Sequence, residues 1–266
     1  MLRFFPSGHS STRTVNSCNR GFSLVELLTV VAILGVLAAI IIPSISAIRV
    51  NSLRTASASN LREWAGALLL FSSEQGQKIP YEGTYDQPSW SQVRAPSETN
   101  AWFNVLPEYV ESPPLSSLRS SSDYDRMIDG KSIHSAPGIE IEERDNRRRP
   151  MFSYMMNSQI YSNEGNAVSN SGSDLIRLSL IANPSRTIFI TETRTSLDDG
   201  APNEDNDRIA RAKGRNNSIS YRYNNQTNVA FLDGHVATVD SKTLYNSGRD
   251  PSVNGGQLDA YVWFPW

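Results

Sequence analysis

The chain has 266 residues, of which 39% are hydrophobic and 20% charged, and its formal net charge is −2. This length and composition fit one medium-sized globular domain with appendages. The negative balance argues against a nucleic-acid partner, because such binding depends on Lys and Arg neutralising phosphates. The only cysteine is Cys18, so residues beyond it have no internal disulfide and no thiol nucleophile.

The first 21 residues are polar and rich in serine. They carry Arg3, Arg13 and Arg20 and no acid, which is typical of the basic front of an export signal. No small-residue cleavage site follows the apolar run after them, and that run is too long for a secretory signal. Any cleavage is therefore expected before the apolar run.

Residues 22–42 form an apolar run whose only charge is Glu26. As a helix this run covers roughly 32 Å, which is about the thickness of a bilayer core. Three arginines precede the run and three follow it within about twenty residues, so counting charges leaves its orientation open. Arg20 abuts the run whereas Arg49 is more distant, which favours a cytoplasmic amino end.

The sequence "GFSLVELL" at residues 21–28 resembles the class III signal of type IV pilins and type II secretion pseudopilins. The resemblance implies that prepilin peptidase cleaves between Gly21 and Phe22 and methylates the new amino group of Phe22. It also implies a filament subunit that catalyses no reaction, located first in the bacterial inner membrane with a periplasmic head. Its expected partners are copies of itself, other pilin-like subunits and the inner-membrane assembly platform.

A lone carboxylate in a membrane helix costs a few kcal/mol and needs a partner. The resemblance implies that Glu26 pairs with the amino terminus of a neighbouring subunit and so sets the axial register of assembly. The alternative is that Glu26 only reaches the interface and gains about 0.3–1 kcal/mol from the helix dipole.

Pro43 closes the apolar run, and two interpretations of it stay open. It either kinks a continuous helix, or it ends one helix while Ser44 caps the next. After Pro43, the sequence predicts an amphipathic helix that runs to about Glu74 and is stopped near Gly76. The apolar stripe expected to hold the head comprises Ile45, Ile48, Ala56, Trp64, Leu68 and Phe71.

The predicted organisation is a leader at 1–21, the membrane half of the helix at 22–42, its amphipathic half at 43–76 and a globular head at 77–266. Residues 101–110 predict a short helix and 112–122 a loop. Strands are predicted at 151–160, 186–193, 218–223, 227–232 and 235–240 because β-branched and aromatic residues are enriched there. The expected fold is therefore α+β, a pilin-like long helix packed on an antiparallel sheet.

Asp233 and Gly234 lie between the last two predicted strands and indicate a hairpin with a type I′ turn. Residues 150–240 resemble a pilin-like subfamily of planctomycetes and verrucomicrobia marked by a His that nine residues separate from an Asp-Gly pair. Tyr223 stands where that His is expected, which predicts a packing role against the hairpin and no imidazole chemistry.

The expected head offers little for catalysis, and we predict no catalytic residue. Residues 134–150 mix acids and arginines and predict a solvated segment, while His235 is expected to be a strand residue. The acidic stretch 197–207 could hold a structural Ca²⁺, because oxygen ligands on a loop suit that ion; otherwise it is a solvated loop. The candidate ligands are Asp198, Asp199, Glu204, Asp205 and Asp207.

Residues 260–266, "AYVWFPW", are expected to cover the core or to present a surface to another subunit. A different class of function also remains open, in which a pilin-type anchor carries a periplasmic enzyme or binding module.

Overall fold

The computed structural model describes residues 23–139, 149–163, 166–167, 175–195 and 211–246. The chain divides by its contacts into two compact units, 1–47 and 48–266. Helix α1 (Leu24–Glu74) contributes residues to both units and is 51 residues long. Its end near Gly76 is confirmed: Gly76 has a φ of 69°, a conformation that glycine adopts without strain.

The helix is continuous through Pro43, so the interpretation in which Pro43 ends one helix and Ser44 caps the next is wrong. The Ser44 hydroxyl instead donates to the carbonyl of Ile40, at 3.0 Å, inside the same helix. Proline removes one backbone donor, yet the bonds on either side hold the flanking turns in helical form. The kink at Pro43 stays a prediction.

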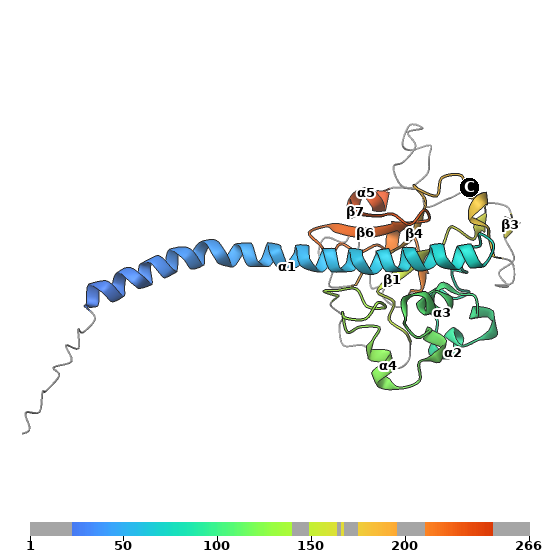
Figure 1. Ribbon diagram of the computed structural model, residues 1–266, viewed down its shortest axis with the longest axis horizontal. Coiled ribbons are helices and arrows are strands. Elements are labelled where there is room, and N and C mark those ends of the chain that lie inside the picture. The colour runs from blue at the N-terminus through green and yellow to red at the C-terminus, as the bar shows by residue number, and fades with distance from the viewer. Residues whose placement is uncertain (1–22, 140–148, 164–165, 168–174, 196–210, 247–266) are drawn as a thin grey trace, which may run out of the picture. The chain divides into compact units, whose positions relative to one another are not determined.

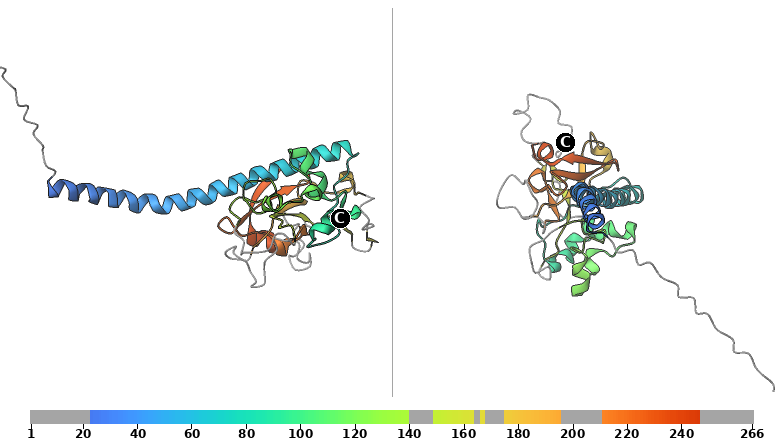
Figure 2. Two further views of the ribbon diagram at one scale, coloured as in Figure 1. Left: turned by 90° about the horizontal axis from the view of Figure 1, so that it is seen from below. Right: turned by 90° about the vertical axis from the view of Figure 1, so that its left-hand side faces the viewer.

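The second unit combines a sheet with short helices on either side of α1 (Figures 1 and 2). The short helical elements are α2 (Trp90–Val93), α3 (Trp102–Val105), α4 (Ser121–Asp125), α5 (Ser241–Asn246) and the 3₁₀ turns η1 (Pro96–Glu98), η2 (Pro107–Val110), η3 (Leu115–Ser117), η4 (Leu178–Leu180) and η5 (Asn216–Ser218). The strands are β1 (Tyr154–Asn157), β2 (Ser162–Asn163), β3 (Asn166–Ala167), β4 (Ile188–Glu192), β5 (Lys213–Gly214), β6 (Gln226–Phe231) and β7 (Val236–Asp240).

The main sheet has the strand order β5-β1-β4-β6-β7, and β2 pairs separately with β3. Strands β1, β4, β6 and β7 pair antiparallel and coincide with four predicted strands. The α+β class is therefore confirmed. The two-residue β5 pairs parallel with β1, so the sheet is mixed and not purely antiparallel.

The strand predicted at 218–223 is wrong. Its first residue ends η5, and only an isolated bridge joins Ile219 to Thr193. Two backbone bonds, from Arg194 N–H to the Ser218 carbonyl at 2.9 Å and from Ser220 N–H to the Glu192 carbonyl at 3.0 Å, hold it across the end of β4. β-propensity cannot distinguish such a short contact from a strand.

The hairpin between β6 and β7 is confirmed, but its turn differs from the predicted type I′ form. The Phe231 N–H donates to the His235 carbonyl at 3.0 Å, which leaves three residues in the loop. Positive φ is confined to Gly234, at 94°. A type I′ geometry occurs instead just before β6, where Asn224 and Asn225 have φ values of 53° and 62°.

The core of the second unit forms on one face of α1. Trp64, Leu68 and Phe71 are buried as predicted, together with Leu61, and the Trp64 ring meets Trp102 edge-on at 5.6 Å. The remainder of the predicted stripe is wrong: Ile45, Ile48 and Ala56 are exposed. From Ser57 to Phe71 one face of the helix is buried and belongs to the core of the head.

Residues 80–125 add an aromatic layer to this core. Trp90, Trp102 and Phe103 are buried in or beside α2 and α3. The predicted helix at 101–110 divides into α3 and η2, and Pro107 starts the second piece. The predicted loop at 112–122 contains the short η3 and the start of α4.

Candidate functional site

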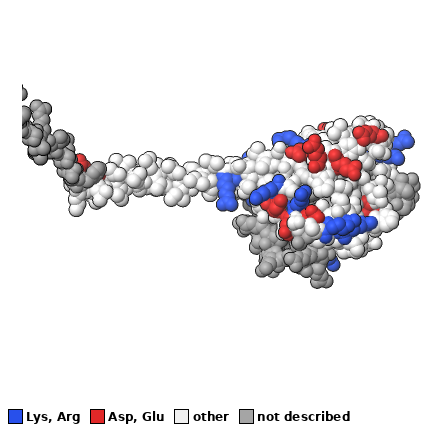
Figure 3. All heavy atoms as spheres, turned by 60° about the horizontal axis from the view of Figure 1, so that its bottom comes forward, with Lys and Arg blue, Asp and Glu red and all other residues white. Residues whose placement is uncertain are grey.

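The apolar half of α1 is exposed over its whole length. Its large side chains keep between 46% and 80% of their surface, from Leu24 at 80% to Val30 at 46%. Helix α1 is long and apolar enough to cross a membrane, by length and composition, and none of the apolar window is buried. On the face in Figure 3 this part of α1 is almost free of colour, whereas acids and bases are scattered over the second unit. Such a surface requires lipid or protein to cover it.

The carboxylate of Glu26 lies in the first turn of α1 and is held by its own helix end. The Ser23 N–H donates to Glu26 Oε2 at 2.8 Å, and the Glu26 N–H donates to Ser23 Oγ at 3.2 Å. Because α1 begins at Leu24, Ser23 is the N-cap and Glu26 the third helical residue, which makes a reciprocal capping box.

Sequence reasoning missed the role of Ser23, although "SLVE" at 23–26 has the spacing of a capping box directly before an apolar run. The box satisfies two backbone donors at the helix start and places the carboxylate at the positive end of the helix dipole. Glu26 therefore has local partners in the single chain, before any partner from another chain is considered.

The other predicted site residues fall outside the described part of the chain. These are Gly21 and Phe22 at the expected cleavage point and the candidate calcium ligands Asp198, Asp199, Glu204, Asp205 and Asp207. Residues 260–266 also fall outside it. Within the described residues, no group of three or more His, Cys, Asp or Glu side chains could hold a metal ion.

A buried carboxylate joins α1 to the sheet. Glu192 of β4 has no exposed surface and accepts a hydrogen bond from the Ser57 hydroxyl of α1. Its other oxygen accepts from Thr227 Oγ1 at 3.0 Å and from the Asn228 N–H at 2.9 Å, both in β6. Several donors offset the cost of burying this carboxyl group, so the contact fixes where α1 lies on the sheet.

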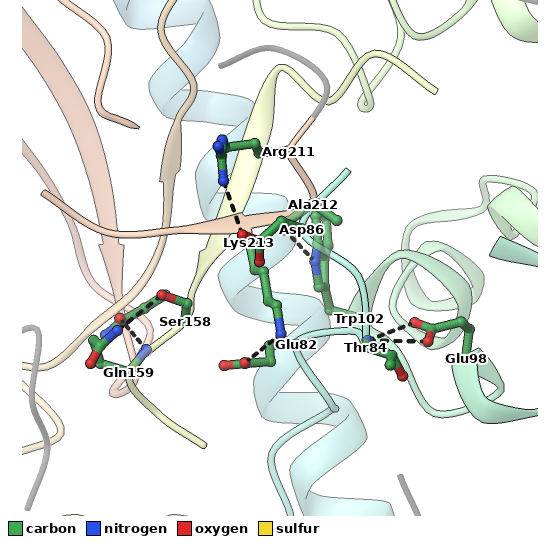
Figure 4. A network of polar contacts seen from close by, with 11 residues as sticks. Glu82, Thr84, Asp86, Glu98, Trp102, Ser158, Gln159, Arg211, Ala212 and Lys213 are labelled. Atoms are coloured by element: carbon green, nitrogen blue, oxygen red, sulfur yellow. Dashed lines mark hydrogen bonds and ion pairs between the residues drawn. The ribbon is translucent and has the colours of Figure 1, made fainter. Parts of the chain in front are cut away.

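A second polar cluster holds the edge strand β5 (Figure 4). Lys213 Nζ lies 3.0 Å from Glu82 Oε1, and both side chains are nearly buried. Burial raises the pKa of Glu82 to about 7, and the adjacent Lys213 opposes that rise. The exposed pair of Arg211 and Asp86, at 3.0 Å, lies next to it along the chain. These contacts connect residues 82–86 to the edge of the sheet formed by β5. The sequence contains no indication of them.

The two described histidines have structural contacts. His134 is buried beside the Trp64 ring, with Ser112 Oγ 3.1 Å from its Nε2, so the predicted solvated segment at 134–150 is wrong at its start. Burial lowers the pKa of His134 to about 4, so it is neutral at pH 7. His235 stacks on Phe231, with ring centroids 4.2 Å apart.

Tyr223 is buried, while the packing against the hairpin that the sequence suggests for it stays a prediction. The side chain is 1% exposed, and its hydroxyl donates to the carbonyl of Pro137 at 2.9 Å. Its backbone also closes the turn into β6, because the Gln226 N–H donates to the Tyr223 carbonyl at 3.1 Å. Burial raises the pKa of Tyr223, so the phenol stays protonated at neutral pH.

The comparison with protein families matches residues 16–42 to the prokaryotic N-terminal methylation motif. No curated protein and no solved structure matches the chain. The matched residues include Gly21, Glu26 and the exposed apolar run to Ile42. The amino-terminal segment is therefore a type IV pilin-like signal, carried on a helix that is long and apolar enough to anchor the chain in a membrane.

Proposed function

We propose that this chain is a structural subunit of a filament, either a type IV pilus-like fibre or a type II secretion pseudopilus. One observation carries the proposal: the methylation motif at 16–42 coincides with the stretch of α1 whose apolar side chains are all exposed. In a bilayer, lipid covers these side chains. In a filament, the same side chains pack against helices of other subunits.

Maturation begins at the cytoplasmic face of the membrane. Prepilin peptidase cleaves between Gly21 and Phe22 and methylates the amino group of Phe22, while the second unit lies in the periplasm. The cleaved leader carries Cys18 and three arginines. The new amino-terminal residue, Phe22, directly precedes Ser23 in the sequence, and α1 begins at Leu24.

Assembly relies on Glu26, which pairs with the Phe22 ammonium group of a neighbouring subunit. The capping box supports this role because it holds the carboxylate at the first turn with its orientation fixed by Ser23. Two charges about 4 Å apart attract by about 4 kcal/mol at an effective dielectric constant near 20, which outweighs a local dipole gain of about 1 kcal/mol. The neighbour's ammonium is thus a stronger partner than the helix end alone.

Intact mass and amino-terminal sequencing of the membrane form test the processing step. The expected product begins at Phe22 and carries one methyl group; a product beginning at Met1, or after the apolar run, overturns the proposal. Glu26→Gln tests the assembly step, because it removes the charge and keeps the shape. The expected result is a normally processed chain that stays in the membrane and yields few filaments. A processed chain that remains monomeric in the wild type supports instead a membrane-anchored binding module or enzyme.

A further inference from the structure

The main sheet has a second buried face, on the side away from α1. Val229 and Phe231 of β6 belong to a cluster on this face, whereas Ala230 between them belongs to the core that α1 shares, because alternate strand residues point to opposite faces. We call this cluster the outer cluster; its members are Met155, Ile188, Ile219, Tyr221, Val229, Phe231, Val239 and Leu244. Ile188 is 0% exposed and Phe231 1% exposed, so this face is covered completely.

The described elements that cover the outer cluster are attached at one end of it. Residues 218–221 cross the end of β4, where Ile219 forms a bridge to Thr193. Helix α5 starts at the same end, because Ser241 Oγ donates to the Ser220 carbonyl at 2.6 Å. With six residues, α5 extends about 9 Å from that point.

The other end of the outer cluster lies beyond these elements. Ile188 pairs with Phe231 there, and it lies five positions before Thr193, which is about 16 Å along the strand. The half-exposed His235 stacks on Phe231, and within the described ranges Ala237 is the one partly buried apolar residue that packs against the cluster. The remaining cover therefore has to come from chain outside the described ranges.

Composition selects the segment that can supply this cover. The segments after α1 that lie outside the described ranges are 140–148, 164–165, 168–174, 196–210 and 247–266. Charged and small polar residues dominate the first four, and such residues are poorly suited to covering an apolar face. The last segment contains "LDAYVWFPW" at 258–266, with four aromatic side chains.

The same segment leaves the described chain beside the outer cluster. It follows α5 directly, and Leu244 of α5 is a member of the cluster. From Asn246 to Tyr261 the chain can reach about 50 Å, which exceeds the roughly 16 Å to the Ile188 end. Chain length therefore allows residues 258–266 to reach the part of the face that lacks described cover.

We propose that residues 258–266 fold over the sheet face opposite α1 and cover the outer cluster of their own chain. The aromatic side chains supply the apolar area that Ile188 and Phe231 require. The short connection to α5 gives this contact a high effective concentration, which favours the same chain over a second copy. Of the two roles open for this aromatic end, the proposal selects covering the core, and it does not depend on the filament function.

Thiol labelling of the full-length monomer in detergent tests the cover, with Cys18→Ser as the background. Ile188→Cys places a thiol in the outer cluster, and the control Ile190→Cys places one two residues away on the α1 side of the sheet. Each variant is compared with the same variant ending at Asn246. The expected result is that truncation speeds labelling of the Ile188→Cys thiol at least about tenfold, while the control thiol stays slow in both chains.

Two results overturn the proposal. One is equally slow labelling of the Ile188→Cys thiol in the full and the truncated chain, because the last residues then cover nothing at this position. The other is fast labelling in the full-length monomer and slow labelling in filaments, because a second copy then supplies the cover.

Oxidative footprinting of the wild type keeps the proposal testable if truncation unfolds the head, which fast labelling of both thiols would reveal. In the detergent-solubilised monomer, Trp263 is expected to be oxidised as slowly as the buried Trp64, and faster only after unfolding in urea. Oxidation of Trp263 in the folded monomer at the rate of the unfolded chain overturns the proposal.

Discussion

The burial of His134 makes the stability of the second unit depend on pH. Its pKa is about 4 in the folded chain against a reference value of 6.5, and desolvation is the main cause. The unfolded chain therefore takes up a proton more readily than the folded one as the pH falls below 6.5. The contribution of neutral His134 to the stability of the folded chain is complete above pH 6.5. It declines between pH 6.5 and 4 and does not change further below pH 4.

Lowering the pKa of His134 from 6.5 to about 4 corresponds to a loss of about 3 kcal/mol of stability at low pH, of which about 2 kcal/mol has been lost by pH 5. For a unit of this size, 2 kcal/mol lowers the melting temperature by about 4–8 °C. Arg126 lowers the pKa further, whereas Asp129 and the backbone at Pro113 act in the opposite direction. These are smaller effects than desolvation.

The measurement is urea unfolding of the full chain in detergent at pH 7.5 and pH 5, for the wild type and for His134→Gln. Glutamine keeps a polar group near Ser112 but does not titrate in this range. The raised pKa of Glu82 contributes in the opposite direction, since its stabilisation of the folded chain declines as pH rises from 4.5 to about 7. That contribution is the same in both proteins and cancels in their difference. Equal pH dependence in the two proteins refutes the assignment.

Three further predictions follow from the contacts of α1 and from the sequence. Ser23→Ala removes the N-cap and is expected to cost the helix start about 1 kcal/mol, which hydrogen exchange of its first turn detects, while Ser23→Thr retains the cap. Ser57→Ala removes a donor to Glu192 and is expected to destabilise the second unit by about 1–3 kcal/mol in chemical unfolding. The control is Ser59→Ala at an exposed position of the same helix, and equal stabilities of the two variants contradict the reasoning. Millimolar Ca²⁺ is expected to raise the melting temperature of the full chain if the acids at 198–207 bind it, and an unchanged value rules that site out.

The amino-terminal part of the molecule, as far as Gly76, could be predicted from the sequence. A long apolar run, one carboxylate and a stop near Gly76 are local signals, and they indicated both the anchor and the extent of α1. The positions of β1, β4, β6 and β7 could also be predicted, because β-branched and aromatic residues are enriched in these segments. In each case, neighbours a few residues apart determine the structure.

The tertiary structure decided the features that depend on distant partners. Glu192 is buried because Ser57, 135 residues earlier, and two residues of β6 supply its donors. His134 is buried because Trp64 packs on it, although the surrounding charges predicted exposure. The parallel pairing of Lys213 with Met156 likewise joins segments far apart in the chain. The local sequence pattern thus determined which segments form the anchor, the helix and most strands, whereas long-range packing decided which polar groups are buried.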